Sequence, residues 1–394
     1  MNFSLLLRIL SFSEKPPSSL SHLRSLTLSM LPSSMMTEEN SVTSDSLFTR
    51  IVECRLPFSR WIKHRENDNK YSRLNQYFPV GDKIPKAEFS KIYRCQNNTG
   101  QHSVLKEINI TNWSDTVPSE LIREVSLLKE LDHPNIVRLQ NVYVQNKGIL
   151  TRKILVNLVF ENLRCDLQDF MYGREYSPNP MMIKSFMNQM LSALAYCHAQ
   201  KILHRDLKPR NVLVDVPNKI VKLADFGSAR PFVERDTIYS NDVGTPWYRA
   251  PEVLLRCPEH TGQIDVWSLG CIFGEMVSGR CVFRSRGEYL ELDGIYSVLG
   301  TPTEETWPGV TGLRAFLATI GRYEPTDLSR IFPHLEPEGF DLLSRMLVLD
   351  PNKRISVEAA LNHPYFRDLN SDQKGKSSSE SLGEKTVQSG CGNE

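Results

Sequence analysis

The pattern of apolar and polar positions divides the middle of the chain into a strand-like part followed by a helical part. Alternation with a period of two over part of residues 103–110 predicts a β-strand, and residues 154–160 predict another. Beyond Asp166 the pattern is mostly helical as far as Phe366. We therefore expect an α+β fold with a small lobe rich in strands and a larger helical lobe.

A helix is expected between these two strands, over residues 119–129. Pro118 stands at its start, where the missing N–H of proline costs nothing. Four apolar side chains form one stripe at helical spacing: Leu121, Ile122, Val125 and Leu128. The spacing predicts an amphipathic helix.

The two ends of the chain differ from its middle. Residues 1–74 begin with a stretch rich in serine and proline, which predicts a disordered extension or sequence upstream of a later start at Met30, Met35 or Met36. The scarcity of acidic residues in this stretch gives organelle targeting as a second interpretation. Residues 367–394 are polar and cannot bury enough surface to order themselves. We expect the folded region to span residues 75–366.

The composition is typical of a globular protein, with 40% hydrophobic and 24% charged residues among 394. The 47 basic and 46 acidic residues nearly cancel, so no overall field favours nucleic acid or a membrane surface. A run of about eighteen apolar residues, which a membrane span requires, is absent from the sequence. We expect neither nucleic acid nor a membrane among the partners.

The eight cysteines are scattered and never form a Cys-x-x-Cys pair. This spacing favours neither a zinc site nor a disulfide framework. It indicates reduced thiols in an intracellular protein, located in the nucleus, the cytoplasm or both.

Three short motifs indicate the chemistry. They are His-Arg-Asp-Leu-Lys-Pro-Arg-Asn at residues 204–211, Asp-Phe-Gly at residues 225–227 and Ala-Pro-Glu at residues 250–252. Each is weak alone, but their order and separation are specific, and together they resemble the signature of eukaryotic protein kinases. The resemblance covers residues 75–366 and implies a two-lobed kinase fold, with the smaller lobe at 75–163 and the larger at 164–366.

The resemblance assigns catalytic roles that suit phosphoryl transfer. The transferred group is a polyanion that passes through a loose transition state, so catalysis is mostly positioning and charge neutralisation. Asp206 matches the carboxylate that orients the attacking hydroxyl and accepts its proton, and Lys208 matches a lysine near the γ-phosphate. Thr245 matches a threonine that contacts the catalytic aspartate.

The same resemblance implies ATP and Mg²⁺ as cofactors. Asn211 and Asp225 match the two metal-holding positions, and their amide and carboxylate oxygens are hard ligands suited to Mg²⁺. Lys106 matches the strand lysine that holds the α- and β-phosphates, and Glu124 matches its ion-pair partner on the helix.

The adenine side of the nucleotide is matched by a further group of residues. Phe160 matches the gatekeeper, Glu161 and Leu163 match the hinge whose backbone binds adenine, and Asp166 matches an acid on the ribose side. The remaining matched pocket positions are Ile84, Ile92, Val104 and Leu213, the last as the floor of the pocket.

The sequence Pro-Ser-Glu-Leu-Ile-Arg-Glu at residues 118–124 resembles the PSTAIRE helix of cyclin-dependent kinases, with Glu120 and Leu121 replacing Thr and Ala. In that family a cyclin swings the helix inward and completes the lysine–glutamate ion pair. The resemblance therefore implies a cyclin as partner. It also implies protein substrates with Ser/Thr-Pro sites, because Val243, Gly244 and Arg249 match the pocket that favours proline after the target residue.

An activating phosphorylation site is expected at Ser240, with an unmodified loop serine as the alternative. In the resemblance Ser240 occupies the position of the activating phosphothreonine. Arg123, Arg205 and Arg230 match the three arginines that would hold its phosphate through charge-assisted hydrogen bonds.

The glycine-rich loop of kinases has lost its glycines in this chain. Its three glycine positions hold Pro85, Ala87 and Ser90. Glycine lets the backbone approach the phosphates, whereas Pro85 removes an N–H donor and the other two side chains crowd them. Two functions follow. The intact catalytic residues favour an active cyclin-dependent serine/threonine kinase, and the altered loop favours a pseudokinase that binds a cyclin or substrate as a scaffold.

Overall fold

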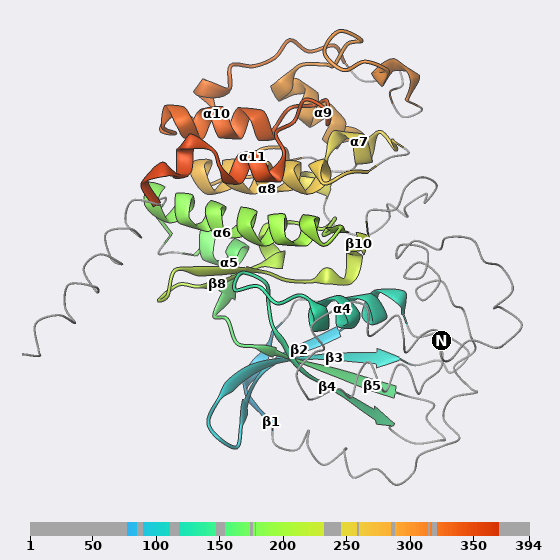
Figure 1. Cartoon of the computed structure of the whole chain (residues 1–394), viewed down its shortest axis with the longest axis vertical. Helices are drawn as coiled ribbons and strands as arrows, with labels where there is room; N and C mark the ends of the chain where they lie inside the picture. Colours follow the sequence, from blue (N-terminus) through green and yellow to red (C-terminus); the bar gives the residue numbers. More distant parts are fainter. Residues whose placement is uncertain are drawn as a thin grey trace, which may run out of the picture. The chain divides into compact units, whose positions relative to one another are not determined.

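The computed structural model of this chain describes residues 77–84, 90–110, 118–146, 154–173, 176–177, 179–231, 246–257, 260–284, 288–313, 316 and 321–369. The predictions for residues 1–74, and for residues 370–394 of the C-terminal tail, lie outside this part. The chain divides into two compact units, each of which is described by itself (Figure 1). The first comprises Met1–Leu163 and Ala224–Val233, and the second comprises Arg164–Leu223 and Glu234–Glu394. One unit is built on a β-sheet and the other mostly on helices, which confirms the predicted α+β fold.

The first unit contains a five-stranded antiparallel sheet with the order β1-β2-β3-β5-β4. The strands are β1 (Tyr77–Ile84), β2 (Ser90–Asn97), β3 (His102–Ile110), β4 (Leu139–Asn146) and β5 (Ile154–Glu161). The predicted strands at residues 103–110 and 154–160 are confirmed as β3 and β5 to within one residue at each end. Strand β5 is buried along nearly its whole length, which explains its continuous apolar pattern.

Helix α4 (Ser119–Glu130) packs in the first unit and confirms the predicted helix. Pro118 stands one position before the helix, and its carbonyl accepts the N–H of Leu121 at 3.1 Å. The buried surface is wider than the predicted stripe. Arg123 and Glu124 are buried along with the apolar residues, whereas Ile122 is only half-buried. The helix therefore directs charged side chains into the interior of the unit, where they need partners.

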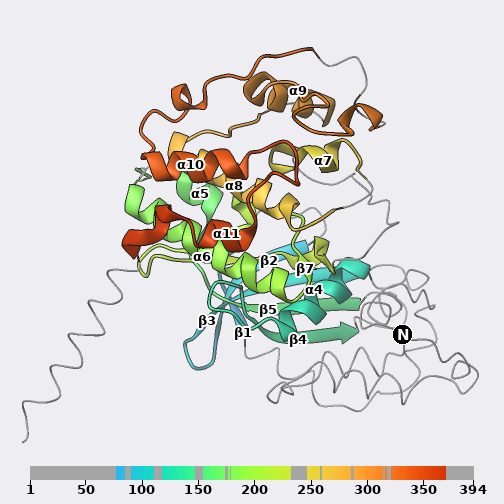
Figure 2. The same ribbon diagram turned by 45° about the horizontal axis from the view of Figure 1, so that its top comes forward.

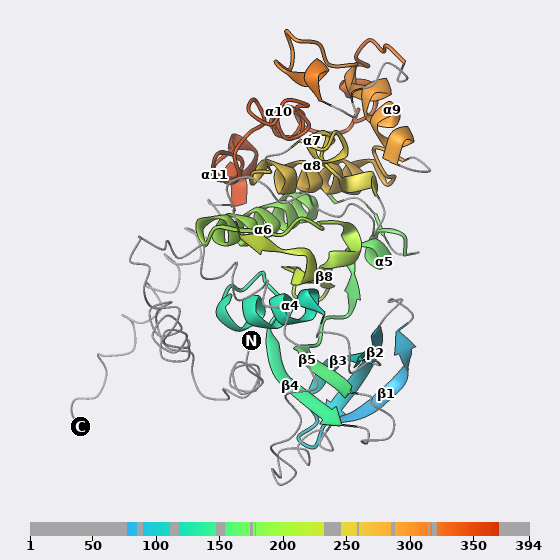
Figure 3. The same cartoon turned by 90° about the vertical axis from the view of Figure 1, so that its right-hand side faces the viewer.

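The second unit is mainly helical, and Figures 2 and 3 show its helices from two further directions. Helix α8 is buried nearly all round and packs against both α6 and α10, while α11 packs on α6. Trp267 of α8 is fully buried and stacks on Phe283 with ring centroids 5.5 Å apart. The helices are α5 (Leu167–Met171), α6 (Pro180–Ala199), α7 (Pro251–Leu254), α8 (Gln263–Ser278), α9 (Glu288–Leu299), α10 (Pro337–Met346) and α11 (Val357–Leu361).

Short elements complete the two units. Strands β6 (Cys165–Asp166), β8 (Val212–Asp215) and β9 (Ile220–Leu223) form a small antiparallel sheet in the second unit. The remaining short strands are β7 (Ile202–Leu203) and β10 (Arg230–Pro231). The 3₁₀ turns are η4 (Pro209–Asn211), η5 (Phe226–Ser228), η6 (Pro246–Tyr248), η7 (Val310–Gly312), η8 (Leu328–Arg330) and η9 (Pro364–Phe366).

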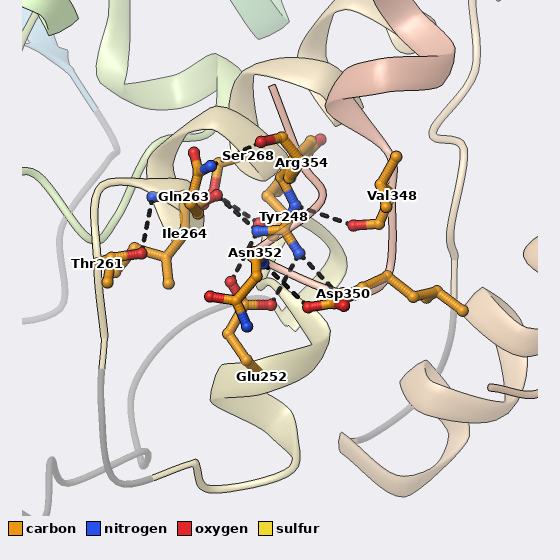
Figure 4. A network of polar contacts seen from close by, with 11 residues as sticks. Tyr248, Glu252, Thr261, Gln263, Ile264, Ser268, Val348, Asp350, Asn352 and Arg354 are labelled. Atoms are coloured by element: carbon orange, nitrogen blue, oxygen red, sulfur yellow. Dashed lines mark hydrogen bonds and ion pairs between the residues drawn. The ribbon is translucent and has the colours of Figure 1, made fainter. Parts of the chain in front are cut away.

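A buried ion pair joins distant parts of the second unit. Glu252 of α7 and Arg354 form two parallel hydrogen bonds of 2.7 and 2.9 Å, and their side chains are 2% and 0% exposed (Figure 4). Arg354 also donates to the carbonyls of Val348 and Gln263, and its guanidinium lies over the ring of Trp267. Every side of this arginine is therefore held by a partner.

A buried lysine of α6 contacts the segment that follows Phe366. Asp368 forms a 3.0 Å ion pair with Lys184 of α6. The same lysine is buried, pairs with Glu336 at 2.8 Å and lies over the ring of Tyr365. Two carboxylates therefore neutralise this buried ammonium group.

No helix in the described part of the chain is long and apolar enough to cross a membrane. The described cysteines are free, and the described residues contain no cluster of histidine, cysteine and acidic side chains that could hold a metal ion.

The turn between β8 and β9 allows a prediction about stability. Lys219 is exposed and has φ of 55°, a left-handed conformation that glycine adopts without a steric penalty. We expect Lys219→Gly to raise the free energy of unfolding by about 0.5–1 kcal/mol. Urea denaturation followed by circular dichroism would measure the change. Lys222→Gly, within β9, serves as the control and should lower stability, and a loss of stability in Lys219→Gly as well would contradict the prediction.

Candidate active site

The first unit brings three of the predicted site residues together. Lys106 of β3 places its Nζ 2.9 and 3.0 Å from the two carboxylate oxygens of Glu124 on α4. The Oδ1 of Asp225 lies 3.7 Å from the same ammonium group. Glu124 is buried, while about half of the Asp225 side chain is exposed. The lysine is therefore a cation between one buried and one accessible carboxylate.

The charge of Lys106 is stabilised by its neighbours. Burial alone would lower the pKa of this amine, but the charges of Glu124 and Asp225 raise it well above its ordinary value. Lys106 therefore stays protonated at any physiological pH. A positioned cation that does not lose its proton is suited to bind a phosphate chain.

Asp225 has a backbone conformation that is unusual for a residue with a side chain. Its φ of 64° is left-handed, and it precedes the turn η5, in which Phe226 is fully buried. Arg123 of α4 donates from Nη1 to the carbonyl of Gly227 at 2.8 Å. This bond and the packing of Phe226 hold the Asp-Phe-Gly segment against α4. Left-handed non-glycine residues that are held in this way occur preferentially at functional sites.

The sheet register places the predicted adenine-side residues on the face that carries Lys106. Lys106 lies opposite Ile92 on β2, and Ile92 lies opposite Ile84 on β1. Val104, two residues before Lys106, lies opposite Phe160 on β5. Directly opposed residues share a face of the sheet, as do residues two apart in a strand. Ile92, Val104 and Phe160 therefore share the face of the sheet that carries Lys106.

The predicted hinge begins at the end of β5. The carboxylate of Glu161 accepts the N–H of Arg138 at 2.8 Å, and its own N–H donates to the Arg138 carbonyl at 3.2 Å. Leu163, the last residue of the first unit, is buried. The side chain of Glu161 is therefore occupied within its own unit, in keeping with a hinge that would bind adenine through its backbone.

The second unit brings together the residues of the 204–211 motif. The Oδ2 of Asp206 accepts hydrogen bonds from Lys208 Nζ at 2.7 Å and from Asn211 Nδ2 at 2.9 Å. Asn211 Nδ2 also donates to the Asp206 carbonyl at 2.7 Å. The Asp206 side chain is about one-third exposed. It is thus a carboxylate fixed on one side and accessible on the other.

Asp265 of α8 anchors this motif, although sequence reasoning assigned it no role in the site. Its Oδ1 accepts the N–H of Arg205 at 2.8 Å, and its Oδ2 accepts the N–H of His204 at 2.9 Å. The Nε2 of His198 lies 3.0 Å from the same Oδ2. Arg205 has φ of 69°, so the anchored backbone is left-handed. The available signal was an acidic residue in the otherwise apolar stretch at residues 264–267.

The ionisation of Asp265 gives a prediction about pH. Burial alone would raise the pKa of this carboxyl, but the hydrogen bond and charge of His198 and the bond from the Arg205 N–H hold it below its ordinary value. A lowered native pKa means that the carboxylate stabilises the fold fully above the unfolded aspartate pKa. This stabilisation is lost as the pH falls through the lowered native pKa.

We therefore expect wild type to exceed Asp265→Asn in unfolding free energy, and this difference to shrink as the pH falls below the pKa of an unfolded aspartate. Urea titrations across the acidic range would measure it, and a difference that did not change with pH would contradict the prediction.

Asp166 and Leu213 lie opposite each other in the small sheet of the second unit. Asp166 is only 1% exposed, and its Oδ1 accepts the N–H of Asp169 at 2.8 Å as the N-cap of α5. A capping oxygen stabilises the first turn of a helix. The carboxylate therefore stabilises the start of α5, and its contact with ribose stays a prediction.

Several predicted site residues lie outside the described residues. These are Ser240 and Thr245, together with the proline-pocket residues Val243 and Gly244 and the loop residues Pro85 and Ala87. Of the predicted phosphate-binding arginines, Arg123 donates to Gly227 as described above, and Arg230 donates to the carbonyl of Ala229 at 3.0 Å. Arg205 belongs to the other unit. The phosphate site thus stays a prediction.

The comparison with protein families agrees with this chemistry. A family model described as the protein kinase domain matches residues 78–366, which is well over half of the chain. The matched region contains the Lys106–Glu124 pair in the first unit and the Asp206 cluster in the second. The chain therefore belongs to the protein kinase domain family.

Proposed function

We propose that this protein kinase transfers the γ-phosphoryl group of ATP to serine or threonine followed by proline, and that a cyclin activates it. The observation that carries the proposal is the closed ion pair between Lys106 and Glu124, at 2.9 Å, on a PSTAIRE-like helix. This pair must form before a protein kinase is active. The proposed location is the nucleus, the cytoplasm or both.

The residues present fit Mg²⁺ and ATP. The Nδ2 of Asn211 donates both of its hydrogen bonds to Asp206. The Oδ1 of Asn211 forms no hydrogen bond among the described residues, so it is available as a ligand. Asp225 presents a half-exposed carboxylate beside the protonated Lys106. Amide and carboxylate oxygens are the ligands that Mg²⁺ prefers in proteins. Bound Mg²⁺ would neutralise the charge that develops on the phosphates.

The chain's own residues would do the rest of the chemistry. Asp206 would orient the substrate hydroxyl and accept its proton at the accessible side of the carboxylate. Lys208, which contacts Asp206 Oδ2 at 2.7 Å, would supply positive charge near the transferred group. Lys106 would position the α- and β-phosphates.

The PSTAIRE-like helix supports a cyclin as the partner. Two residues of the motif differ from the family, and the structure separates them. Leu121 is buried within the first unit, whereas Glu120 is exposed. Only the Glu120 substitution therefore changes the accessible surface of the helix, and it is the one that would influence which cyclin binds.

Binding of Mg²⁺-ATP to the full chain is the first test of the proposal. Thermal shift and calorimetry would measure it, with Asp225→Asn as the matched variant. We expect binding that depends on Mg²⁺ and that Asp225→Asn weakens. A cyclin screen with a Ser/Thr-Pro peptide as substrate would follow.

A pseudokinase scaffold is the second candidate, favoured by Pro85, Ala87 and Ser90 at the glycine positions of the phosphate loop. It predicts cyclin or substrate binding without phosphate transfer. Failure to bind ATP both alone and with a cyclin present would favour the scaffold.

A further inference from the structure

The turn η6 in the second unit is fixed by hydrogen bonds to helix α8. The hydroxyl of Tyr248 donates to Glu275 Oε2 at 2.7 Å, and the hydroxyl of Ser268 donates to the Tyr248 carbonyl at 2.7 Å. Figure 4 shows Ser268 and Tyr248 beside the buried arginine network of this unit. Both the side chain and the backbone of Tyr248 are thus bonded to α8. Trp247, the preceding residue, is therefore presented on a fixed support.

The buried carboxylate beneath this turn is already satisfied. Glu275 is almost fully buried, and its Oε1 accepts the hydroxyl of Tyr172 at 2.7 Å while its Oε2 accepts that of Tyr248. Tyr172 is nevertheless 54% exposed as a residue. The two tyrosines occupy both oxygens of Glu275, so this acid forms no ion pair with a basic residue among the described contacts.

The exposed Arg284 contacts the tryptophan of this turn. The guanidinium carbon of Arg284 is 5.3 Å from the centroid of the Trp247 ring, a cation–π contact. Arg284 forms no ion pair within the described part of the chain, and its positive charge also acts on the neighbouring Tyr172. The site therefore combines a cation, its aromatic support and a second exposed aromatic ring.

We propose that Arg284 is a specificity-determining residue that binds an anionic side chain of the protein substrate. The proposal rests on the proposed function, in which Trp247 lies between Thr245 at the catalytic aspartate and Arg249 at the substrate's proline. A guanidinium that lies over an aromatic ring can still donate from its N–H edges, and these edges match the two oxygens of a carboxylate or phosphate. Holding the arginine in place also reduces the entropy that it loses on binding.

Reversing the charge of Arg284, and separately the charge of the peptide side chain, tests this proposal. The full chain with its activating cyclin would be assayed on Ser/Thr-Pro peptides in which glutamate, phosphoserine, alanine or lysine replaces each flanking residue in turn. For wild type, we expect one position at which glutamate or phosphoserine raises kcat/KM about fivefold over alanine. Arg284→Glu should abolish this ratio and favour lysine at the same position. Comparison of the glutamate peptide with the phosphoserine peptide shows whether a carboxylate or a phosphate is the preferred group.

Arg280 provides the matched control, because it is an exposed arginine of the same segment. Arg280→Glu should keep the wild-type preference for the anionic peptide. If Arg284→Glu kept that preference too, or lowered kcat/KM equally for all peptides, Arg284 would only support Trp247 and the proposal would be wrong.

Peptide binding to the full chain, measured by fluorescence anisotropy, separates this proposal from the proposed function. If the chain with a cyclin bound phosphorylates no peptide, the proposed function fails, and the anisotropy of the glutamate and alanine peptides still decides the role of Arg284. Tighter binding of the glutamate peptide that Arg284→Glu reverses supports the proposal, and equal binding of the two peptides overturns it.

Discussion

Replacing Asp206 with asparagine is expected to lower kcat for a Ser/Thr-Pro peptide by about a thousandfold, within the range found for general-base catalysis. An amide cannot accept the proton of the attacking hydroxyl. The substitution also removes the negative charge that orients Lys208 and Asn211 at 2.7 and 2.9 Å. Steady-state kinetics of the full chain with its activating cyclin would measure the loss.

ATP binding should persist in Asp206→Asn, because Lys106 and Asp225 are unchanged. Calorimetry with Mg²⁺-ATP would check this point. Asp215→Asn, in which the same change is made at the last residue of β8, is the matched control and should retain activity. Unchanged phosphorylation by Asp206→Asn would mean that Asp206 is not the base.

The fold was predictable where local pattern and tertiary environment agree. Strand β5 has apolar residues on both faces and is buried on both, and the turn before β3 is marked by Gly100 with φ of 84°. Helix α4 was predictable in its extent but not in its burial. Its pattern indicated one apolar stripe, whereas Arg123 and Glu124 are also inside because Gly227 and Lys106 satisfy them.

The candidate site was predictable where its residues are contiguous in sequence. Asp206, Lys208 and Asn211 lie within one motif, so their identities and spacing already indicated the cluster. Asp265 joins that motif from about sixty residues away, and a single sequence gives no sign of such a pairing. The ribose contact of Asp166 stays a prediction, and the structure adds that its carboxylate caps the N-terminus of α5.

The Glu252–Arg354 ion pair likewise depends on residues 102 positions apart, and it gives the largest expected effect on stability. Glu252→Gln would leave the guanidinium of Arg354 buried without its counter-charge. We expect the free energy of unfolding to fall by about 3–5 kcal/mol, as for other buried pairs that lose one partner. Urea denaturation of the full chain, followed by the fluorescence of buried tryptophan, would measure the loss.

The double variant Glu252→Gln, Arg354→Met separates the cost of an unpaired charge from the loss of packing. Removing the buried charge should recover part of the stability lost in Glu252→Gln, so the double variant should be more stable than that single variant. Arg345→Met is the matched control. It breaks a 3.0 Å ion pair with Asp341 in which both side chains are about half exposed, and such pairs contribute only about 0.2–1 kcal/mol. A double variant no more stable than Glu252→Gln would show that the hydrogen bonds of Arg354 to carbonyls, rather than the charge pair, hold this part of the unit together.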